Sequence, residues 1–267
     1  MTLAFTRRGS GPPLVLLHGI GSARQAWDPV AGRLAESFDV LAVDLPGVGE
    51  SPPLPPEIEP LPSVIAAAVA EFLASRGVVA PHVAGNSLGG WVALELAAIR
   101  PVRSLALLSP AGLWRGRTPL YNRISLRSTH WLATHLTGPA CRLVGHRAGR
   151  VVILGQTHGR PARISAGYAR AAVLAMAGGP GFDATMAATE PRCYRAGRPF
   201  DAPVTVAFGT RDRLLLPHQS RHLGELPPGA YVETLPGCGH VPMADDPGAV
   251  AALITAATDR ARPVRTR

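Results

Sequence analysis

Short apolar runs alternate with longer amphipathic segments along most of this 267-residue chain. The runs are apolar at every position, which is typical of strands in a parallel sheet covered on both faces. The segments between them show helical spacing, and one begins with Asp246 as N-cap and Pro247 at its first position. This alternation predicts a doubly wound α/β fold with right-handed crossovers. The apolar runs expected to form strands are 14–17, 40–43, 82–84, 105–108 and 204–208, and a further strand near 231–235 fits the same series. The expected helices are 24–36, 63–75, 88–99, 217–225 and 247–257.

The alternation stops in one long segment that is rich in Arg, Gly and Ala. This segment has few strand-like runs and shows helical spacing near 120–136 and 163–177. We therefore expect a mostly helical insertion in an α/β core, followed by a basic tail that is flexible. The expected parts are the core at 1–113 and 199–258, the insertion at 114–198 and the tail at 259–267.

The composition is that of a folded protein, with 46% hydrophobic and 17% charged residues, and it excludes general disorder. No apolar run approaches the ~18–20 residues of a membrane span, and the N-terminal run 14–17 is shorter than the ~7–15-residue core of a signal peptide. Cys141, Cys193 and Cys238 show no zinc or disulfide spacing and suit a reducing compartment. We expect a cytoplasmic protein.

The net charge of +9 is concentrated in the insertion. All 27 basic residues of the chain are arginines, and thirteen of them lie within 114–198 against only Asp183 and Glu190, a net charge of +11. This excess suits a solvated surface, attraction of an anionic substrate or an acidic carrier protein, or attachment to a membrane surface. The arginines are not interleaved with aromatic residues on a recognisable module, which argues against nucleic acid as a partner.

Residues 85–89 read Gly-Asn-Ser-Leu-Gly, a G-x-S-x-G pattern between an expected strand and an expected helix. A sharp turn there forces strained dihedral angles on Ser87, lifts its hydroxyl above the sheet and places it at a helix N-terminus. Gly85 and Gly89 leave room for the chain to pass closely. In this context the pattern predicts a nucleophile, whereas the pattern alone fits a helix-capping serine equally well.

A serine hydroxyl is a poor nucleophile and needs a base that an acid orients. Asp212 and His240 each follow an expected strand, so both should lie at the carboxyl ends of strands, where open α/β sheets place their sites. Asp201 precedes its strand and therefore lies at the opposite edge. Asp44 ends a strand, but its loop predicts a local structural role.

An acyl-transfer site also needs two preorganised N–H donors for the oxyanion. Leu88 follows Ser87 directly and supplies one. Ile20, in the turn that follows the first expected strand, is the candidate for the other. His18 in the same turn is expected to stabilise the turn and not to act as the base.

These motifs together resemble the α/β-hydrolase superfamily. The resemblance implies an α/β-hydrolase fold, with a mostly parallel eight-stranded sheet and a helical cap inserted after the sixth strand. It implies Ser87, Asp212 and His240 as a catalytic triad, with the Ile20 and Leu88 amides as oxyanion hole. Haloalkane dehalogenases and epoxide hydrolases of the superfamily carry Asp at the elbow, so the serine argues against both. The matching segments are LLHGIGS at 16–22, DLPGVGES at 44–51, GNSLGGWVALELA at 85–97, FGTRD at 208–212 and GCGHVPMADDP at 237–247.

We therefore expect a serine hydrolase without cofactor or metal that cleaves a small or medium carboxylic ester, as a carboxylesterase does, through an acyl-enzyme. A thioesterase or acyltransferase and a C–C bond hydrolase remain alternatives on this scaffold. Val241 stands after His240 where C–C hydrolases often carry an aromatic residue, which disfavours the last. Outside the enzymes, the alternative is a hydrolase-like protein that binds a ligand without turnover.

Two groups in the insertion have open roles. Trp114, Tyr121, Trp131 and Met176 suit either the wall of an acyl pocket or ordinary packing. His130 and His135 are five residues apart without a carboxylate at ligand spacing, which favours polar surface over a metal site.

Overall fold

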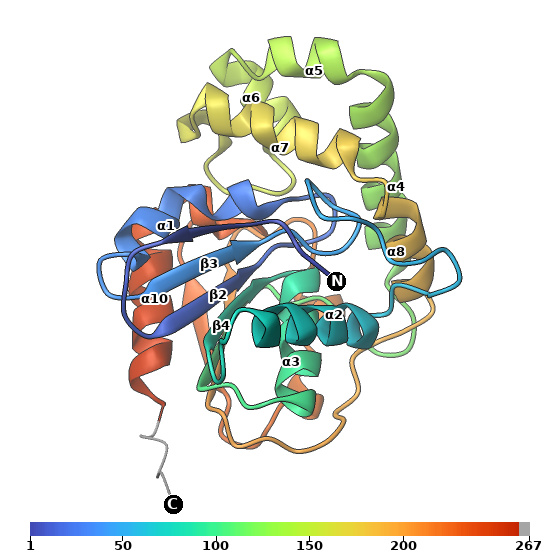
Figure 1. Ribbon diagram of the computed structural model, residues 1–267. Helices are drawn as coiled ribbons and strands as arrows, with labels where there is room; N and C mark the ends of the chain where they lie inside the picture. The colour runs from blue at the N-terminus through green and yellow to red at the C-terminus, as the bar shows by residue number, and fades with distance from the viewer. Residues whose placement is uncertain (262–267) are drawn as a thin grey trace, which may run out of the picture.

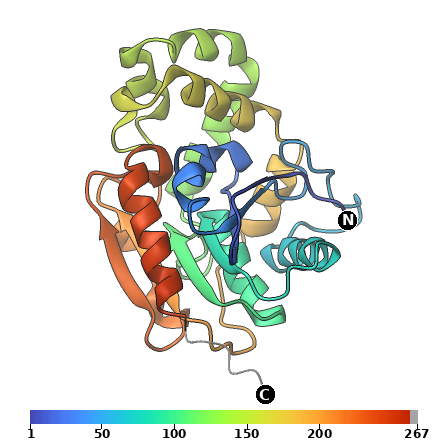
Figure 2. The ribbon, with the colours of Figure 1, turned by 60° about the vertical axis from the view of Figure 1, so that its left-hand side comes forward.

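The computed structural model describes residues 1–261, and they form one sheet with helices on both faces, topped by a group of helices at one end (Figures 1 and 2). The strand order is β1-β3-β2-β4-β5-β6-β7, with β1 antiparallel to β3 and every other pair parallel. The expected doubly wound α/β fold is confirmed. The strands are β1 Phe5–Arg8, β2 Pro13–Leu17, β3 Asp39–Val43, β4 His82–Asn86, β5 Ser104–Leu108, β6 Val204–Gly209 and β7 Tyr231–Leu235.

The described part of the sheet has seven strands where the resemblance implies eight, and the helical insertion follows the fifth strand instead of the sixth. A single strand, β1, precedes β2 in the chain and pairs with the outer edge of β3. The apolar-run criterion misses β1 because its sequence, Phe-Thr-Arg-Arg, belongs to an edge strand with polar residues turned to solvent. The other edge, β7, is likewise exposed at Tyr231 and Val232.

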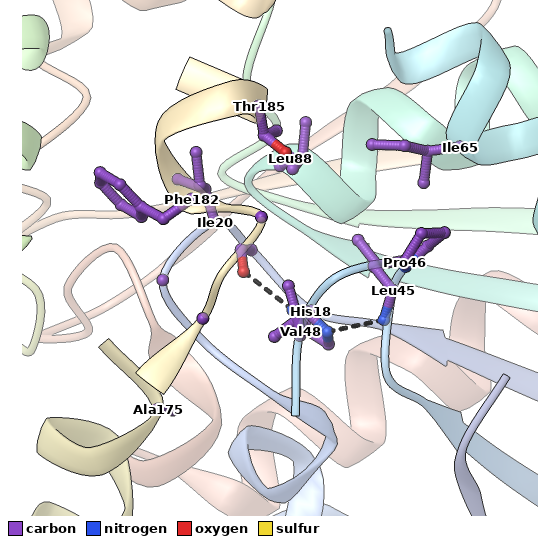
Figure 3. Close-up of a pocket in the computed structure, with 14 residues that line it drawn as sticks. His18, Ile20, Leu45, Pro46, Val48, Ile65, Leu88, Ala175, Phe182 and Thr185 are labelled. Atoms are coloured by element: carbon purple, nitrogen blue, oxygen red, sulfur yellow. Dashed lines mark hydrogen bonds between the residues drawn. The ribbon is translucent and has the colours of Figure 1, made fainter. Parts of the chain in front are cut away.

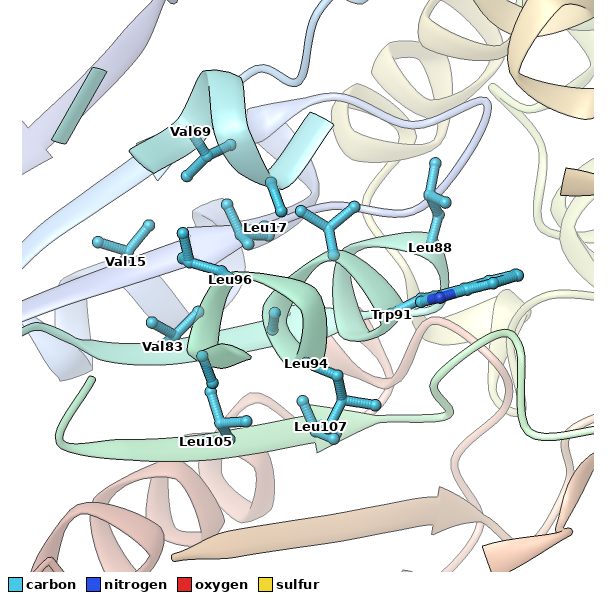
Figure 4. Close-up of a cluster of buried hydrophobic side chains, with 14 of the residues drawn as sticks. Val15, Leu17, Val69, Val83, Leu88, Trp91, Leu94, Leu96, Leu105 and Leu107 are labelled. Carbon is cyan, nitrogen blue, oxygen red and sulfur yellow. The ribbon is translucent and has the colours of Figure 1, made fainter. Parts of the chain in front are cut away.

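Four helices cover the two faces of the sheet. The helices α1 (Asp28–Leu34) and α10 (Pro247–Asp259) pack together on one face, and α2 (Pro62–Ser75) and α3 (Leu88–Ile99) on the other. Figure 4 shows the second of these cores, in which α2 and α3 pack their apolar side chains on β2, β4 and β5. The helix α10 has the expected cap, since the Asp246 carboxylate accepts the Ala249 N–H at 3.0 Å.

The helix expected at 217–225 is broken into α9 (Pro217–Ser220) and the short 3-10 helix Leu223–Glu225. The break falls at Arg221 and His222. The His222 N–H donates to the carbonyl oxygen of Leu113, 2.9 Å away, instead of to the preceding turn. A tertiary hydrogen bond thus ends this helix, and a single-sequence pattern does not reveal it.

The insertion between β5 and β6, residues 114–198, is called the cap below. Figure 1 shows its helices α5, α6 and α7 stacked beyond one end of the sheet, with α4 and α8 leading to and from them. The cap has a small apolar core of its own, which includes Val144, Leu154 and Val173. No helix among residues 1–261 is long and apolar enough to cross a membrane. The cap helices are α4 Leu120–His135, α5 Thr137–Leu143, α6 Arg147–Leu154, α7 Ala166–Gly178 and α8 Phe182–Thr189.

Most of the expected basic tail, residues 262–267, lies outside the described residues.

The stability of the fold should fall in mild acid because of two buried histidines. Burial lowers the pKa of His82 to about 4 and that of His158 to about 4, whereas an imidazole in an unfolded chain titrates near about 6.5. Between these values the unfolded chain binds protons that the folded chain does not, so the free energy of unfolding decreases as pH falls across this window. Urea unfolding at about pH 7 and about pH 4.5 measures the change. The acid-induced loss should be smaller in His82→Gln, and an equal loss in that variant would contradict the assignment.

Candidate active site

Ser87 occupies the turn between β4 and α3 with φ 54° and ψ −118°, a backbone conformation that non-glycine residues avoid. Such strain costs of the order of 1–3 kcal/mol and persists only where the surroundings impose it. The Ser87 N–H donates to the Leu108 carbonyl at 3.0 Å, and its own carbonyl accepts the Ala111 N–H at 2.9 Å. Both bonds tie the turn to the end of β5.

Glycines around this turn permit its close packing. A Cβ on Gly85 would lie 2.3 Å from the Gly89 carbonyl oxygen, and a Cβ on Gly89 would lie 2.2 Å from that of Leu17. The motif glycines therefore have a steric role that no other residue can take. Gly19, which the sequence analysis did not single out, is a third such position, since its Cβ would lie 2.9 Å from the Ser87 Cβ.

His240 and Asp212 form a buried pair at the carboxyl ends of β7 and β6. The His240 Nδ1 lies 3.0 Å from the Asp212 Oδ2, and the two side chains are 4% and 1% exposed. The other carboxylate oxygen accepts the N–H groups of Leu214 and Leu215 at 2.9 and 2.8 Å. Burial by itself raises the pKa of Asp212, but the facing imidazole and the two N–H groups outweigh it and lower that pKa. The carboxylate therefore orients the ring through Nδ1, and the Nε2 atom makes no hydrogen bond within residues 1–261.

Asn86 connects the turn of Ser87 with the loop of His240. Its side-chain N–H₂ donates to the carbonyl oxygens of Leu108 and His240, each 2.9 Å away. The residue directly before the serine is thus bonded to the histidine that lies 154 positions later. The sequence analysis missed this role because the position is variable in the G-x-S-x-G pattern.

A narrow cavity, with about 350 Å³ of atom-free space that is partly open to solvent, adjoins the turn (Figure 3). Ile20 and Leu88 both line it, and within residues 1–261 neither of their backbone N–H groups donates to another protein group. Ser87 itself is not among the lining residues, so the cavity lies beside the hydroxyl and not around it. The lining residues are mostly apolar: His18, Gly19, Ile20, Gly21, Leu45, Pro46, Val48, Ile65, Leu88, Ala175, Gly179, Gly181, Phe182 and Thr185.

His18 and Asp44, the alternatives to His240 and Asp212, make hydrogen bonds that stabilise their own loops. The His18 Nδ1 donates to the Gly19 carbonyl at 2.8 Å, and its Nε2 accepts the Leu45 N–H at 3.0 Å (Figure 3). Burial lowers the pKa of this ring, so both nitrogens hold the turn and neither is free to take a proton. Asp44 accepts the Arg24 N–H at 2.7 Å and also pairs with the Arg24 guanidinium, which agrees with a role in its loop.

The aromatic candidates of the cap do not line the cavity. Trp114 packs edge-on against Trp91, Tyr121 donates to a backbone carbonyl and Trp131 is 56% exposed. Met176 comes nearest, since its sulfur would lie 2.5 Å from a Cβ on Gly21.

The cap histidines have protein partners. The His130 ring stacks on Phe182, with its Nδ1 hydrogen-bonded to the Met176 carbonyl oxygen, and His135 stacks on Trp131. Residues 1–261 contain no group of three or more His, Cys, Asp or Glu side chains arranged to hold a metal ion.

Several cap arginines pair with carboxylates. Glu190 pairs with Arg117, Arg123 and Arg127. Two more, Arg192 and Arg195, pair with Glu59 and Glu225 of the core. A second group has no carboxylate within 4.0 Å in the part of the chain that the structure describes, and it leaves the excess charge on the surface. This group includes Arg142, Arg147, Arg163 and Arg170.

A mostly parallel sheet with a strained serine between strand and helix defines the class of α/β hydrolases. The chain matches the model of the Alpha/beta hydrolase family over residues 14–253 and belongs to that family. It is 29% identical to an uncharacterized protein of Mycobacterium tuberculosis over 97% of this chain and 79% of the relative. It is 28% identical to a pimeloyl-[acyl-carrier protein] methyl ester esterase of Chromobacterium violaceum over 91% and 92% of the two chains. The structure of a hydrolase from Pseudomonas aeruginosa has the same fold, with a TM-score of 0.74 at 24% identity over 95% and 93% of the chains.

Replacement of Asn86 tests the link between the two loops. Asn86→Ala removes both hydrogen bonds and leaves two buried carbonyl oxygens without this donor, so the free energy of unfolding should fall by about 1–3 kcal/mol. Urea denaturation followed by circular dichroism measures the loss. Ser75→Ala, which removes one local helix-end bond, is the control and should lose less. Equal stability of Asn86→Ala and the wild type would contradict the link.

Proposed function

We propose that the protein is a serine hydrolase that cleaves a carboxylic ester with Ser87 as nucleophile, His240 as base and Asp212 as the orienting acid. The observation that carries the proposal is the buried His240–Asp212 hydrogen bond at the same edge of the sheet as the strained serine. A hydroxyl on a strained turn and an oriented imidazole are the parts that nucleophilic acyl transfer requires.

In the proposed reaction the Nε2 of His240 takes the proton of the Ser87 hydroxyl as its oxygen attacks the ester carbonyl. The oxyanion that forms accepts hydrogen bonds from the Ile20 and Leu88 N–H groups, which have no acceptor within residues 1–261. The protonated imidazole then donates to the leaving alcohol, and the Asp212 carboxylate stabilises its positive charge. Water attacks the resulting acyl-enzyme by the same steps and releases the acid.

The cavity supports a substrate with a short apolar acyl group. Its walls are mostly aliphatic, aromatic or glycine residues, and the α7–α8 segment of the cap forms one side of it. The Chromobacterium relative is a methyl ester esterase by name, which favours an ester over the C–C bond of the alternative. A thioesterase or acyltransferase would use the same residues, so it remains the second candidate.

Covalent labelling tests the nucleophile. A fluorophosphonate should modify the wild type at one serine, and Ser87→Ala should abolish both labelling and ester hydrolysis because no other hydroxyl is held in this turn. Intact-mass spectrometry measures the adduct. Ser109→Ala, which changes the other serine with positive φ, is the control and should keep the label. A folded wild type that takes no label would instead support a binding protein without turnover.

The size of the cavity predicts a preference for short acyl chains. Turnover of p-nitrophenyl esters of increasing acyl length should be fastest for short chains and should fall as the chain exceeds the cavity. Val48→Ala removes two methyl groups from the wall and should move the optimum toward longer chains. Val79→Ala, on an exposed loop far from the cavity lining, should leave it unchanged. A flat profile in the wild type would contradict the assignment of the cavity as the acyl site.

A further inference from the structure

The Asp245 carboxylate is buried and accepts three backbone N–H groups from two separate parts of the chain. Its Oδ2 accepts the N–H groups of Gly239 and Gly159, each at 2.7 Å, and its Oδ1 accepts that of Arg160, also at 2.7 Å. Asp245 is only 7% exposed. Gly239 directly precedes His240, whereas Gly159 and Arg160 belong to the cap. The carboxylate therefore joins the histidine loop to the cap.

Further contacts show that the cap segment 157–160 is built into the loops of the catalytic pair. The Val241 N–H, directly after His240, donates to the Thr157 carbonyl at 2.9 Å. On the other loop, the guanidinium of Arg211, the neighbour of Asp212, donates to the Gly159 carbonyl at 3.1 Å. The segment thus bonds both residues that flank His240, one of them through Asp245.

The cap segment 157–160 and the histidine loop 237–239 contact each other directly through their backbones, and glycines make this close contact possible. A Cβ on Gly159 would lie 2.2 Å from the Gly237 carbonyl oxygen, and a Cβ on Gly239 would lie 2.6 Å from the Gly159 nitrogen. Glycine loops have large conformational freedom and no side chains to pack. The Asp212 carboxylate orients the imidazole ring. The backbone on either side of His240 is held by other hydrogen bonds, that of Gly239 to Asp245 and that of Val241 to Thr157.

We propose that Asp245 is a positioning residue for His240 and that the cap segment 157–160 is a fixed part of the catalytic centre. The inference rests on the proposed role of His240 as the base. Two ionised oxygens can accept three N–H donors at once. An amide in this place offers a single acceptor oxygen and turns an N–H₂ group toward at least one N–H. A neutral replacement should therefore loosen the loop and move the imidazole away from Ser87.

Asp245→Asn should lower kcat by about 10- to 100-fold, since a displacement of about 1 Å has this effect on a positioned base. The rate of fluorophosphonate labelling should fall in parallel, while the final stoichiometry of labelling stays that of the wild type. KM for a short ester should change little, because the acyl cavity lies on the α7–α8 side and includes none of residues 157–160. A merely structural role would lower the labelled fraction and leave kcat per labelled site unchanged.

Three further variants complete the test. Asp245→Glu keeps the carboxylate and should recover part of kcat. Gly159→Ala, in the cap, inserts a methyl group against the histidine loop and should lower kcat per labelled site without touching Asp245. Arg211→Met removes one hydrogen bond between an exposed side chain and the segment 157–160. The variant should fold, and its kcat per labelled site should fall less than that of Asp245→Asn.

Asp39→Asn is the matched control. This carboxylate is also nearly buried, but it lies at the first residue of β3 and pairs with Arg7 of β1, away from the segment 157–160. Its loss should lower Tm but leave kcat per labelled site unchanged. The inference is overturned if every folded variant at positions 159, 211 and 245 keeps the wild-type kcat per labelled site. Failure of the proposed function has a different signature, because the wild type itself would then take no label at Ser87.

Discussion

The whole arrangement depends on holding the Ser87 backbone in a conformation that L-amino acids avoid. Hydrogen bonds to the end of β5 and the contact of Gly85 with Gly89 impose it from both sides. The strain is of the order of 1–3 kcal/mol, which a sheet with two apolar cores can sustain. The turn places Ser87 at the carboxyl edge of the sheet, directly before Leu88, and the N–H groups of Leu88 and Ile20 have no acceptor within residues 1–261.

The electrostatic environment of the site follows from burial combined with specific partners. Burial alone would raise the pKa of Asp212, but the imidazole and two backbone N–H groups stabilise the carboxylate and lower that pKa. His18 shows the opposite outcome, since burial lowers its pKa and both of its nitrogens are used in the turn. Of these two histidines, only His240 is hydrogen-bonded to a carboxylate, and its Nε2 atom makes no hydrogen bond within residues 1–261.

The cap contributes at two separate places. Its α7–α8 segment closes the apolar cavity beside the Ile20 and Leu88 amides, whereas its segment 157–160 packs against the loops of His240 and Asp212. In the proposed reaction, the first contact would limit the size of the acyl group and the second would fix the position of His240. The cap therefore contacts the core both at the cavity and at the loops of His240 and Asp212, although its arginines give it a much higher positive charge than the core.

Much of the core and of the candidate site could be predicted because the signals are local. The five buried strands β2 to β6 and the Gly-x-Ser-x-Gly turn are recognised from patterns of a few residues. Parallel strands bring their carboxyl ends to one edge whatever the loops contain. The sequence pattern did not predict β1, because an edge strand does not need an apolar run. It did not predict the break after α9, because the carbonyl of Leu113, distant in the sequence, causes it.

Gly19, Asn86 and Asp245 lie within the segments that resemble the superfamily, but the sequence did not reveal their roles, since each contacts a segment that the chain reaches only after folding. Asn86 bonds a carbonyl 154 residues away, and Asp245 bonds backbone 85 and 86 residues away. The sequence by itself determined the class of fold, the turn at Ser87 and the chain order of Ser87, Asp212 and His240, because hydrophobic periodicity and the residue pattern of a tight turn are short-range signals. Only the tertiary structure decided which backbone groups hold the histidine in place, because those contacts depend on how the cap returns to the core.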